Sequence, residues 1–543
     1  MNLEAIHLAA RTGLPGTNGP ISKYSWFALP LEIRLIILGL VAAVEVEEVP
    51  GRQKSSIPIF ASVCLEWQLF FERHTFRRLV LDSSTLTKFA KFVKGNKATR
   101  LNYIRFVWLR IKLPEYTCLS CSKAEDGDTV RNNNRIFTSA IMKLMKVLSA
   151  WKPGYRREGL TLEISAHSPS DGKHQFMNIE MEDDYPFQLE EDLKRTPGVL
   201  EYHRRRTEEI RQRQGPHRQT AVTRGHLDRA HGTPFELRPW RLRNKRGRPM
   251  AMPTLAEAPI VTGLRIRGQG FRSLAAMTFA RLFQESLTGL LWFGIQRWTS
   301  LRDEYEEIFF RGMKLWRNIT DSCVDFENDV LPALPRSLMT FSFDQWQEVG
   351  APPRRARLAR LMATWCQHLT AFCPPRSMDA LDFFRQIIAM RTQLHPGPVW
   401  SKLELLCLNC RSFEPSSSQA TITEVLVFAG KAAKLMPNLR EMEIWNTSPE
   451  YCYLFRYKLD RLRATIIWRC PEETNFDLTP GTIETWVAVA SERTHRQLSV
   501  EVQPFLMAAP ALPIYQILVL RRSFFDPVTL AQSYARMTLR QNR

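Results

Sequence analysis

The feature that most constrains the fold is an alternation of short, apolar, strand-like runs with amphipathic helical runs, which recurs through most of the 543 residues. After residue 330, strand-like runs start near residues 337, 369, 402 and 439, at a spacing of about 32 to 37 residues. A strand–helix unit of this size cannot bury its own apolar face. We therefore expect neighbouring units to stack, with parallel strands lining one surface.

Six runs have the apolar alternation of strands, and five have the periodicity of helices. The expected strands span residues 103–113, 160–166, 261–267, 337–343, 402–410 and 439–445, and the helices 135–151, 273–285, 354–367, 377–390 and 422–435. Leu403, Leu406 and Leu408 reproduce the L-x-x-L-x-L core of a leucine-rich repeat strand, followed by Cys410. The expected fold class is α/β, an irregular leucine-rich-repeat-like solenoid. A doubly wound α/β domain is the alternative.

Composition limits the class of protein. Apolar residues make up 44% and aromatic residues 10% of the chain, which is typical of globular proteins. The N-terminus lacks a secretory signal pattern, and no apolar run is long enough to cross a membrane. Ten cysteines are too few for a disulfide scaffold. We expect no membrane partner, and a cytoplasmic or nuclear location or both.

Pattern changes divide the chain into five parts. Residues 1–23, rich in Gly and Pro, are expected to be disordered. Residues 24–81 form a helical domain, and residues 82–170 the first part of the α/β region. A basic, flexible insert is expected over 171–256, and 257–543 complete the α/β region. The chain is too long for one compact core.

Charge is concentrated in the insert. The net charge is +20, and residues 191–250 hold 16 Lys or Arg against 7 Asp or Glu. Lys245-Arg246-Gly247-Arg248-Pro249 contains the R-G-R-P core that resembles an AT-hook, a minor-groove DNA-binding motif, and Arg241 and Arg243 would add phosphate contacts. A nuclear-import signal over 241–248 and a solvated linker are the alternatives. Nucleic acid is therefore a possible partner.

Two apolar stripes predict helices near the N-terminus. Pro30 suits the first turn of a helix. The first stripe comprises Leu29, Ile33, Ile36, Ile37, Leu40 and Val44, and the second comprises Phe60, Val63, Cys64, Trp67, Phe70 and Phe71. Periodicity alone indicates a small helical bundle.

The residue identities are more specific. Leu29-Pro30-x-Glu32-Ile33 with Ile37-Leu38, then Val63-Cys64-x-x-Trp67 and Phe76-Arg77-x-Leu79, resemble the F-box in order and spacing. The resemblance implies a three-helix module with a core of Val63, Cys64 and Trp67. It also implies that Leu29, Pro30, Ile33, Ile37 and Leu38 face the adaptor of a cullin-type ubiquitin ligase. Beyond this module, most of the chain outside the insert resembles a group of fungal F-box proteins whose C-terminal region is a domain of unknown function. The matching stretches are residues 103–113, Cys118-x-x-Cys121, residues 133–137, 160–171 and 439–445.

This resemblance implies a substrate receptor that links an unknown target protein to a cullin-RING (SCF-type) ligase. We expect no enzyme and no cofactor, because no catalytic constellation or nucleotide-binding motif is evident. His167-Ser168-Pro169-Ser170-Asp171 predicts a turn that ends a strand. A nuclear DNA-associated protein and a scaffold independent of ubiquitin ligase are the alternative functions.

Two C-x-x-C pairs have the spacing of half a zinc site. Cys118 and Cys121 follow a strand and are weak metal candidates, with free thiols in a polar loop as the alternative. Cys407 and Cys410 lie in a strand-like run, where alternation places the two thiols on opposite faces. No metal is expected there.

Overall fold

A computed structural model describes the chain over most of the expected elements. The described residues are 26–47, 57–151, 159–171, 198–213, 223–237, 254–267, 272–296, 326–344, 352–376, 378–394, 400–447, 451–461, 463–474, 476–494, 497–505, 518–524 and 531.

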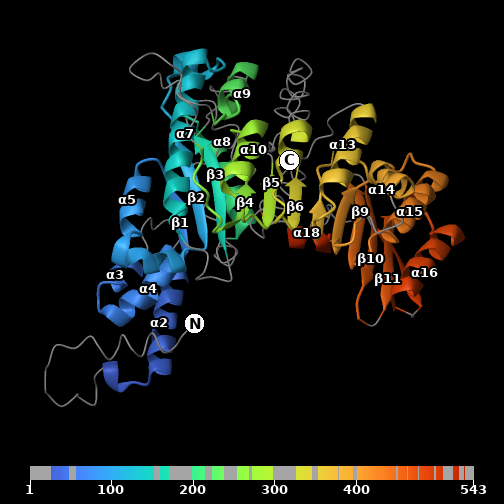
Figure 1. Ribbon diagram of the computed structural model, residues 1–543, viewed down its shortest axis with the longest axis horizontal. Coiled ribbons are helices and arrows are strands. Elements are labelled where there is room, and N and C mark those ends of the chain that lie inside the picture. Colours follow the sequence, from blue (N-terminus) through green and yellow to red (C-terminus); the bar gives the residue numbers. More distant parts are fainter. Residues whose placement is uncertain are drawn as a thin grey trace.

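Twelve strands form one sheet in which spatial order follows chain order (Figure 1). The strands are β1 (Arg78–Leu81), β2 (Phe106–Lys112), β3 (Leu160–His167), β4 (Val261–Ile266), β5 (Trp292–Gln296), β6 (Thr340–Asp344), β7 (Ala371–Cys373), β8 (Leu405–Asn409), β9 (Glu441–Thr447), β10 (Cys452–Leu459), β11 (Ala464–Pro471) and β12 (Leu498–Phe505).

From β1 to β9, each strand is parallel to the next. β10 pairs antiparallel with both β9 and β11, and β12 is parallel to β11. A doubly wound sheet reverses its strand order at a switch point. The twelve described strands contain no such reversal, so the doubly wound alternative is wrong for them.

Helices connect the strands. They are α5 (Thr85–Phe92), η2 (Gly95–Tyr103), α6 (Cys118–Cys121), α7 (Gly127–Leu148), α8 (Val199–Arg213), α9 (Arg224–His231), α10 (Ala276–Arg281), η6 (Leu282–Ser286), η7 (Phe326–Val330), η8 (Leu331–Ala333), α13 (Pro352–Trp365), α14 (Ala380–Leu394), α15 (Gln419–Ala433), η9 (Glu472–Thr474), α16 (Pro480–Thr494) and α18 (Val519–Phe524). Before β1 come η1 (Trp26–Ala28), α2 (Leu31–Glu47), α3 (Ile57–Phe60) and α4 (Leu65–Arg77). No helix of the described part is long and apolar enough to span a membrane.

Side-chain alternation explains the two faces of the sheet. In β8, Leu406 and Leu408 join the main core with helices such as α7, α14, α15 and α16. Leu405 and Cys407 point to the other side, where they pack with α18. Because strand side chains alternate with a period of two, one face carries the main helical layer and the other carries α18.

One expected boundary needs correction. The flexible insert was expected over 171–256, but Arg224–His231 is a helix and the following Phe235 and Leu237 are buried in the main core. Phe235 stacks on Phe137 with ring centroids 4.8 Å apart. The insert is therefore not flexible throughout, because its few apolar side chains find partners on α7.

Candidate functional site

The N-terminal helices pack around a small cluster of their own. Leu38 and Ala42 of α2 and Phe71 of α4 are buried in it. Trp67 lies at its edge, with ring centroids 5.6 Å from Trp26 and 5.5 Å from Phe71. This cluster holds the helices at the β1 end of the sheet, away from α13 to α16 (Figure 1).

Polar contacts fix the orientation of α2 on α4. Glu66 of α4 lies 3.3 Å from the Arg34 guanidinium and accepts a 3.0 Å hydrogen bond from the Trp26 indole. At the other end of α4, Glu72 accepts a 3.1 Å hydrogen bond from Nε of Arg100, in η2. These groups are mostly buried, so the helices have a defined position relative to the strands.

The outer side of α2 is apolar as well. Ile33, Ile36 and Leu40 are 43%, 57% and 62% exposed and follow one another at three- and four-residue spacing, so they form one stripe. Leu29, just before the helix, is 38% exposed and extends the stripe by one turn.

A second exposed apolar set surrounds α3. Ile59, Val63 and Leu65 are 68%, 60% and 50% exposed. Both helices rest on the same small cluster. We call the exposed residues of this unit the N-terminal apolar face: Phe27, Leu29, Ile33, Ile36, Leu40, Ile59, Val63 and Leu65.

The residues expected to bind an adaptor are not all exposed. Leu29, Pro30 and Ile33 are exposed, and Ile37 is half-buried. Leu38 has no exposed surface, so its assignment to the adaptor-facing side is wrong: it belongs to the core.

The core assignment needs one correction too. Val63 is mostly exposed, so it is not a core residue. Trp67 lies against the cluster, and Cys64 is the half-buried residue before α4. Ile36 and Leu40 were visible as part of the first stripe, whereas Ile59 and Leu65 carried no signal beyond being apolar.

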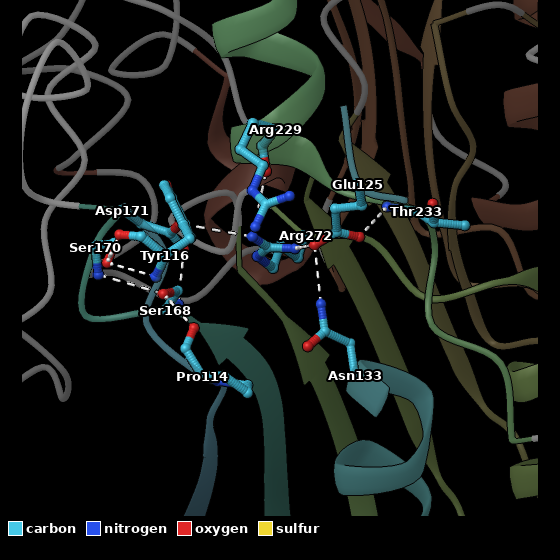
Figure 2. A network of polar contacts seen from close by, with 10 residues as sticks. All are labelled: Pro114, Tyr116, Glu125, Asn133, Ser168, Ser170, Asp171, Arg229, Thr233 and Arg272. Carbon is cyan, nitrogen blue, oxygen red and sulfur yellow. Dashed lines mark hydrogen bonds and ion pairs between the residues drawn. The ribbon is translucent and has the colours of Figure 1, made fainter. Parts of the chain in front are cut away.

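A buried polar network at the carboxyl ends of β2, β3 and β4 is the second notable site. Figure 2 shows Arg272 between Glu125 on one side and Asp171 with Tyr116 on the other. The guanidinium nitrogens lie 2.6 Å from the Glu125 carboxylate and 3.5 Å from that of Asp171. Burial alone would lower the pKa of Arg272, but Asp171 and Glu125 raise it above its ordinary value.

The turn after β3 is part of this network. Asp171 accepts hydrogen bonds from the Tyr116 hydroxyl (2.9 Å) and the Ser168 amide (2.8 Å), and the Ser170 hydroxyl donates to the Tyr116 carbonyl (2.9 Å). Burial, and then Asp171, raise the pKa of Tyr116. The predicted strand-ending turn is confirmed, with Asp171 donating its amide to the Ser168 carbonyl at 2.9 Å.

The same network holds the α9 segment. Glu125 accepts hydrogen bonds from the Asn133 amide (2.9 Å) and the Thr233 backbone (3.1 Å), and Arg272 donates to the Arg229 carbonyl (3.2 Å). The Arg229 guanidinium lies 4.5 Å from the centre of the Tyr116 ring (Figure 2). The network therefore joins α9 to the loops of the sheet.

The two C-x-x-C pairs differ in how deeply their thiols are buried. Cys118 is exposed and Cys121 is buried, with its thiol 3.1 Å from the Cys118 carbonyl. Burial raises the pKa of Cys121. Cys407 packs with α18 and Cys410 in the main core, which confirms that they point to opposite faces. Over the described ranges, no three His, Cys, Asp or Glu side chains group as metal ligands.

The basic motif is not placed by the structure. Arg241, Arg243, Lys245, Arg246, Gly247, Arg248 and Pro249 lie outside the described residues.

Comparison with known proteins gives one result. Neither the curated proteins nor the solved structures contain a significant match to the chain. A family model does match: DUF6546, a family of unknown function, over residues 326–517, which span η7 to β12. The C-terminal region is therefore similar to a domain family of unknown function.

Proposed function

We propose that this chain is a non-catalytic substrate receptor that docks its N-terminal helices onto the adaptor of an SCF-type ubiquitin ligase. The observation that carries the proposal is the N-terminal apolar face. Large apolar side chains gathered on one small unit are typical of docking sites, whereas scattered ones need no explanation.

The face supports docking on energetic grounds. Ile33, Ile36 and Leu40 each have about half of their side chain in water. Full burial of such a side chain stabilises a complex by about 1.5 to 3 kcal/mol, and half of that remains available at each position. The core behind them is closed by Leu38 and Phe71, so docking needs no unfolding of the unit.

The F-box resemblance supplies the kind of partner. Its adaptor-facing positions Leu29, Pro30 and Ile33 are exposed at the start of α2. We propose that Ile36 and Leu40, which are exposed, extend this contact in place of the buried Leu38.

The sheet supports a receptor role for the rest of the chain. Strands β1 to β9 add in sequence, each parallel to the last, as stacked repeats of a solenoid do. Four successive strands, β6 to β9, begin at Thr340, Ala371, Leu405 and Glu441. Their spacing is close to the length of about 32 to 37 residues expected for one strand–helix unit. We propose that this leucine-rich-repeat-like region holds a target protein, and that proximity to a separate enzyme is the only contribution of the chain.

A pull-down of the full chain with an SCF-type adaptor tests the proposal. Wild type is expected to retain the adaptor, and Leu29→Asp with Ile33→Asp is expected to lose it. The matched control places the same charges on exposed apolar residues outside the N-terminal apolar face, Leu119→Asp with Val487→Asp, which are 84% and 45% exposed. Failure of wild type to bind, or equal loss in the control, refutes the adaptor claim.

A further inference from the structure

The C-terminal helix α18 lies on the side of the sheet opposite the main helical layer. It contacts β6, β7, β8 and β9, which are far from it in the sequence (Figure 1). We call this side of β7 to β10 the rear face, defined by the residues that pack with α18: Ala371, Cys373, Cys407, Trp445, Cys452 and Leu454.

The part of this contact that the structure describes is small. Among the described side chains of the segment, the buried apolar ones are Leu518, Leu520 and Phe524. Helices α14, α15 and α16, by comparison, contribute many side chains to the main core. Over the described residues, a six-residue helix and the residue before it place three buried apolar side chains on the rear face, and a segment of similar size can compete with them.

A buried carboxylate recognises the backbone of α18. Oε1 of Glu443 accepts the amide hydrogen of Val519 at 3.0 Å, and Oε2 accepts that of Leu520 at 3.2 Å. Nε and Nη2 of Arg456 hold the same carboxylate at 2.7 and 2.6 Å. Recognition of two main-chain amides depends on the shape of the bound segment and not on its side chains.

Polar and charged side chains lie next to one another on the rear face, which suits a surface that α18 does not cover all the time. Cys407, Glu443 and Arg456 are register neighbours on β8, β9 and β10. A permanently buried ion pair is often no more stabilising than an apolar pair of the same volume. If α18 leaves the rear face, by contrast, the ion pair of Glu443 and Arg456 becomes exposed to water. The free-energy cost of exposing it is small, because both charges become hydrated.

We propose that the rear face is a recognition site for a short helical segment of a partner protein and that α18 occupies it as an intramolecular competitor. The partner segment would present apolar side chains at the spacing of Leu518, Leu520 and Phe524. It would have free amide hydrogens at its start and no carboxylate beside them, because Glu443 would repel one. This inference rests on the proposed receptor function for the identity of the partner as a target protein, but the site itself does not.

The test releases α18 in the full chain. Leu520→Asp with Phe524→Asp places two charges against the rear face, and the control is Leu119→Asp with Val487→Asp. The probe is an N-acetylated, fluorescent peptide of residues 517–525. The expected result is at least tenfold tighter binding of the peptide to the released variant than to wild type or control. Maleimide modification of Cys373 and Cys407, followed by mass spectrometry, is expected to be at least tenfold faster in the released variant.

Two further variants locate the binding. The peptide with the same two Asp substitutions is expected not to bind, and Leu454→Asp added to the released variant is expected to weaken binding tenfold or more. The inference is overturned if a folded released variant does not bind the peptide, or if its two thiols stay protected. Loss of the wild-type circular dichroism spectrum would also overturn it, because α18 would then be part of the core.

An adaptor pull-down with the released variant separates this inference from the proposed function. A chain that binds the adaptor but not the peptide refutes the inference alone. A chain that binds the peptide but not the adaptor refutes the ligase proposal alone.

Discussion

Replacing Arg272 by Met should detach the α9 segment from the sheet. Arg272 is the cation of the buried network, and its guanidinium lies between the Glu125 and Asp171 carboxylates. Met keeps much of the side-chain volume but removes the charge and the donors. Two buried carboxylates would then lack their main compensating charge.

The expected cost is large. Removing one partner of a buried ion pair typically destabilises a protein by about 3 to 5 kcal/mol, because the remaining charge stays desolvated. The matched control is Arg131→Met, whose guanidinium pairs with Asp128 in a contact that is 69% and 91% exposed. Exposed pairs of this kind contribute about 0 to 1 kcal/mol.

Trypsin cleavage after Arg229 measures the local effect, because Arg229 is buried in α9 against the network. A cost of 3 kcal/mol in local opening corresponds to an increase in the open population of about 100-fold or more. We therefore expect cleavage at this site to be at least about 100-fold faster in Arg272→Met under conditions where reclosing outpaces cleavage.

A second substitution tests the cause. Glu125→Gln added to Arg272→Met removes one uncompensated charge and keeps one amide oxygen, which can accept from either Asn133 or Thr233. It should recover part of the loss. Equal cleavage rates in Arg272→Met and Arg131→Met would refute the reasoning.

Four other substitutions test separate parts of the account. Phe71→Ala should cost about 3 to 5 kcal/mol and expose the N-terminal helices to protease while the sheet stays folded, because Phe71 has no exposed surface in the helical cluster; unchanged protease resistance would contradict this. Gly232→Ala should lower the thermal midpoint, since Gly232 has φ of +59° and a Cβ there would lie 2.2 Å from Nη1 of Arg272. Gly39→Ala in α2, where the new Cβ would meet nothing within 4 Å beyond its chain neighbours and its own helix backbone, should raise the thermal midpoint and stabilise the protein by about 0.5 to 1 kcal/mol. A higher midpoint for Gly232→Ala than for Gly39→Ala would contradict these two expectations. Burial raises the pKa of Glu443 to about 7 from 4.5, so the folded state holds a proton that the unfolded state has lost between these values. The free energy of unfolding of wild type, relative to that of Glu443→Gln, should therefore fall by at most about 3 kcal/mol as the pH rises from 4.5 to 7, and the thermal midpoint should fall with it. A relative midpoint that rises over this window would show that the carboxylate is stabilised as an anion.

Alternation along the chain predicted much of the sheet. The runs at 160–166, 261–267 and 439–445 became β3, β4 and β9, with ends shifted by at most two residues. Strands β10, β11 and β12 were not assigned. In β10 and β11 the side chains on both faces are largely apolar or long, so the period-two signal is weak there. β12 has a clear alternation over LSVEVQ and was missed in spite of it.

The N-terminal helix shows where periodicity fails. α2 is apolar on two sides, with Ile33, Ile36 and Leu40 outside and Leu38 and Ala42 inside. A helix that is apolar around most of its circumference gives no indication of which side is buried. The burial of Leu38 therefore could not be predicted without knowing how α2 packs against α4.

Of the polar network, the sequence predicted the turn after β3 but not the contacts that Glu125 and Arg272 make. Glu125 and Arg272 are 147 positions apart, and each is an ordinary charged residue in a loop of the sequence. Only the order of the strands brings them together. The α9 segment was likewise hidden, because Phe235 and Leu237 are isolated apolar residues in a basic stretch.

Calorimetric titration of the full chain with the purified adaptor tests the central claim most directly. The account predicts a one-to-one complex with a negative heat-capacity change, because binding would bury the N-terminal apolar face. It also predicts that Ile36→Asp weakens the complex at least about tenfold while Leu119→Asp leaves it unchanged. Absence of a complex with wild type, or equal affinities for wild type and Ile36→Asp, would contradict the account.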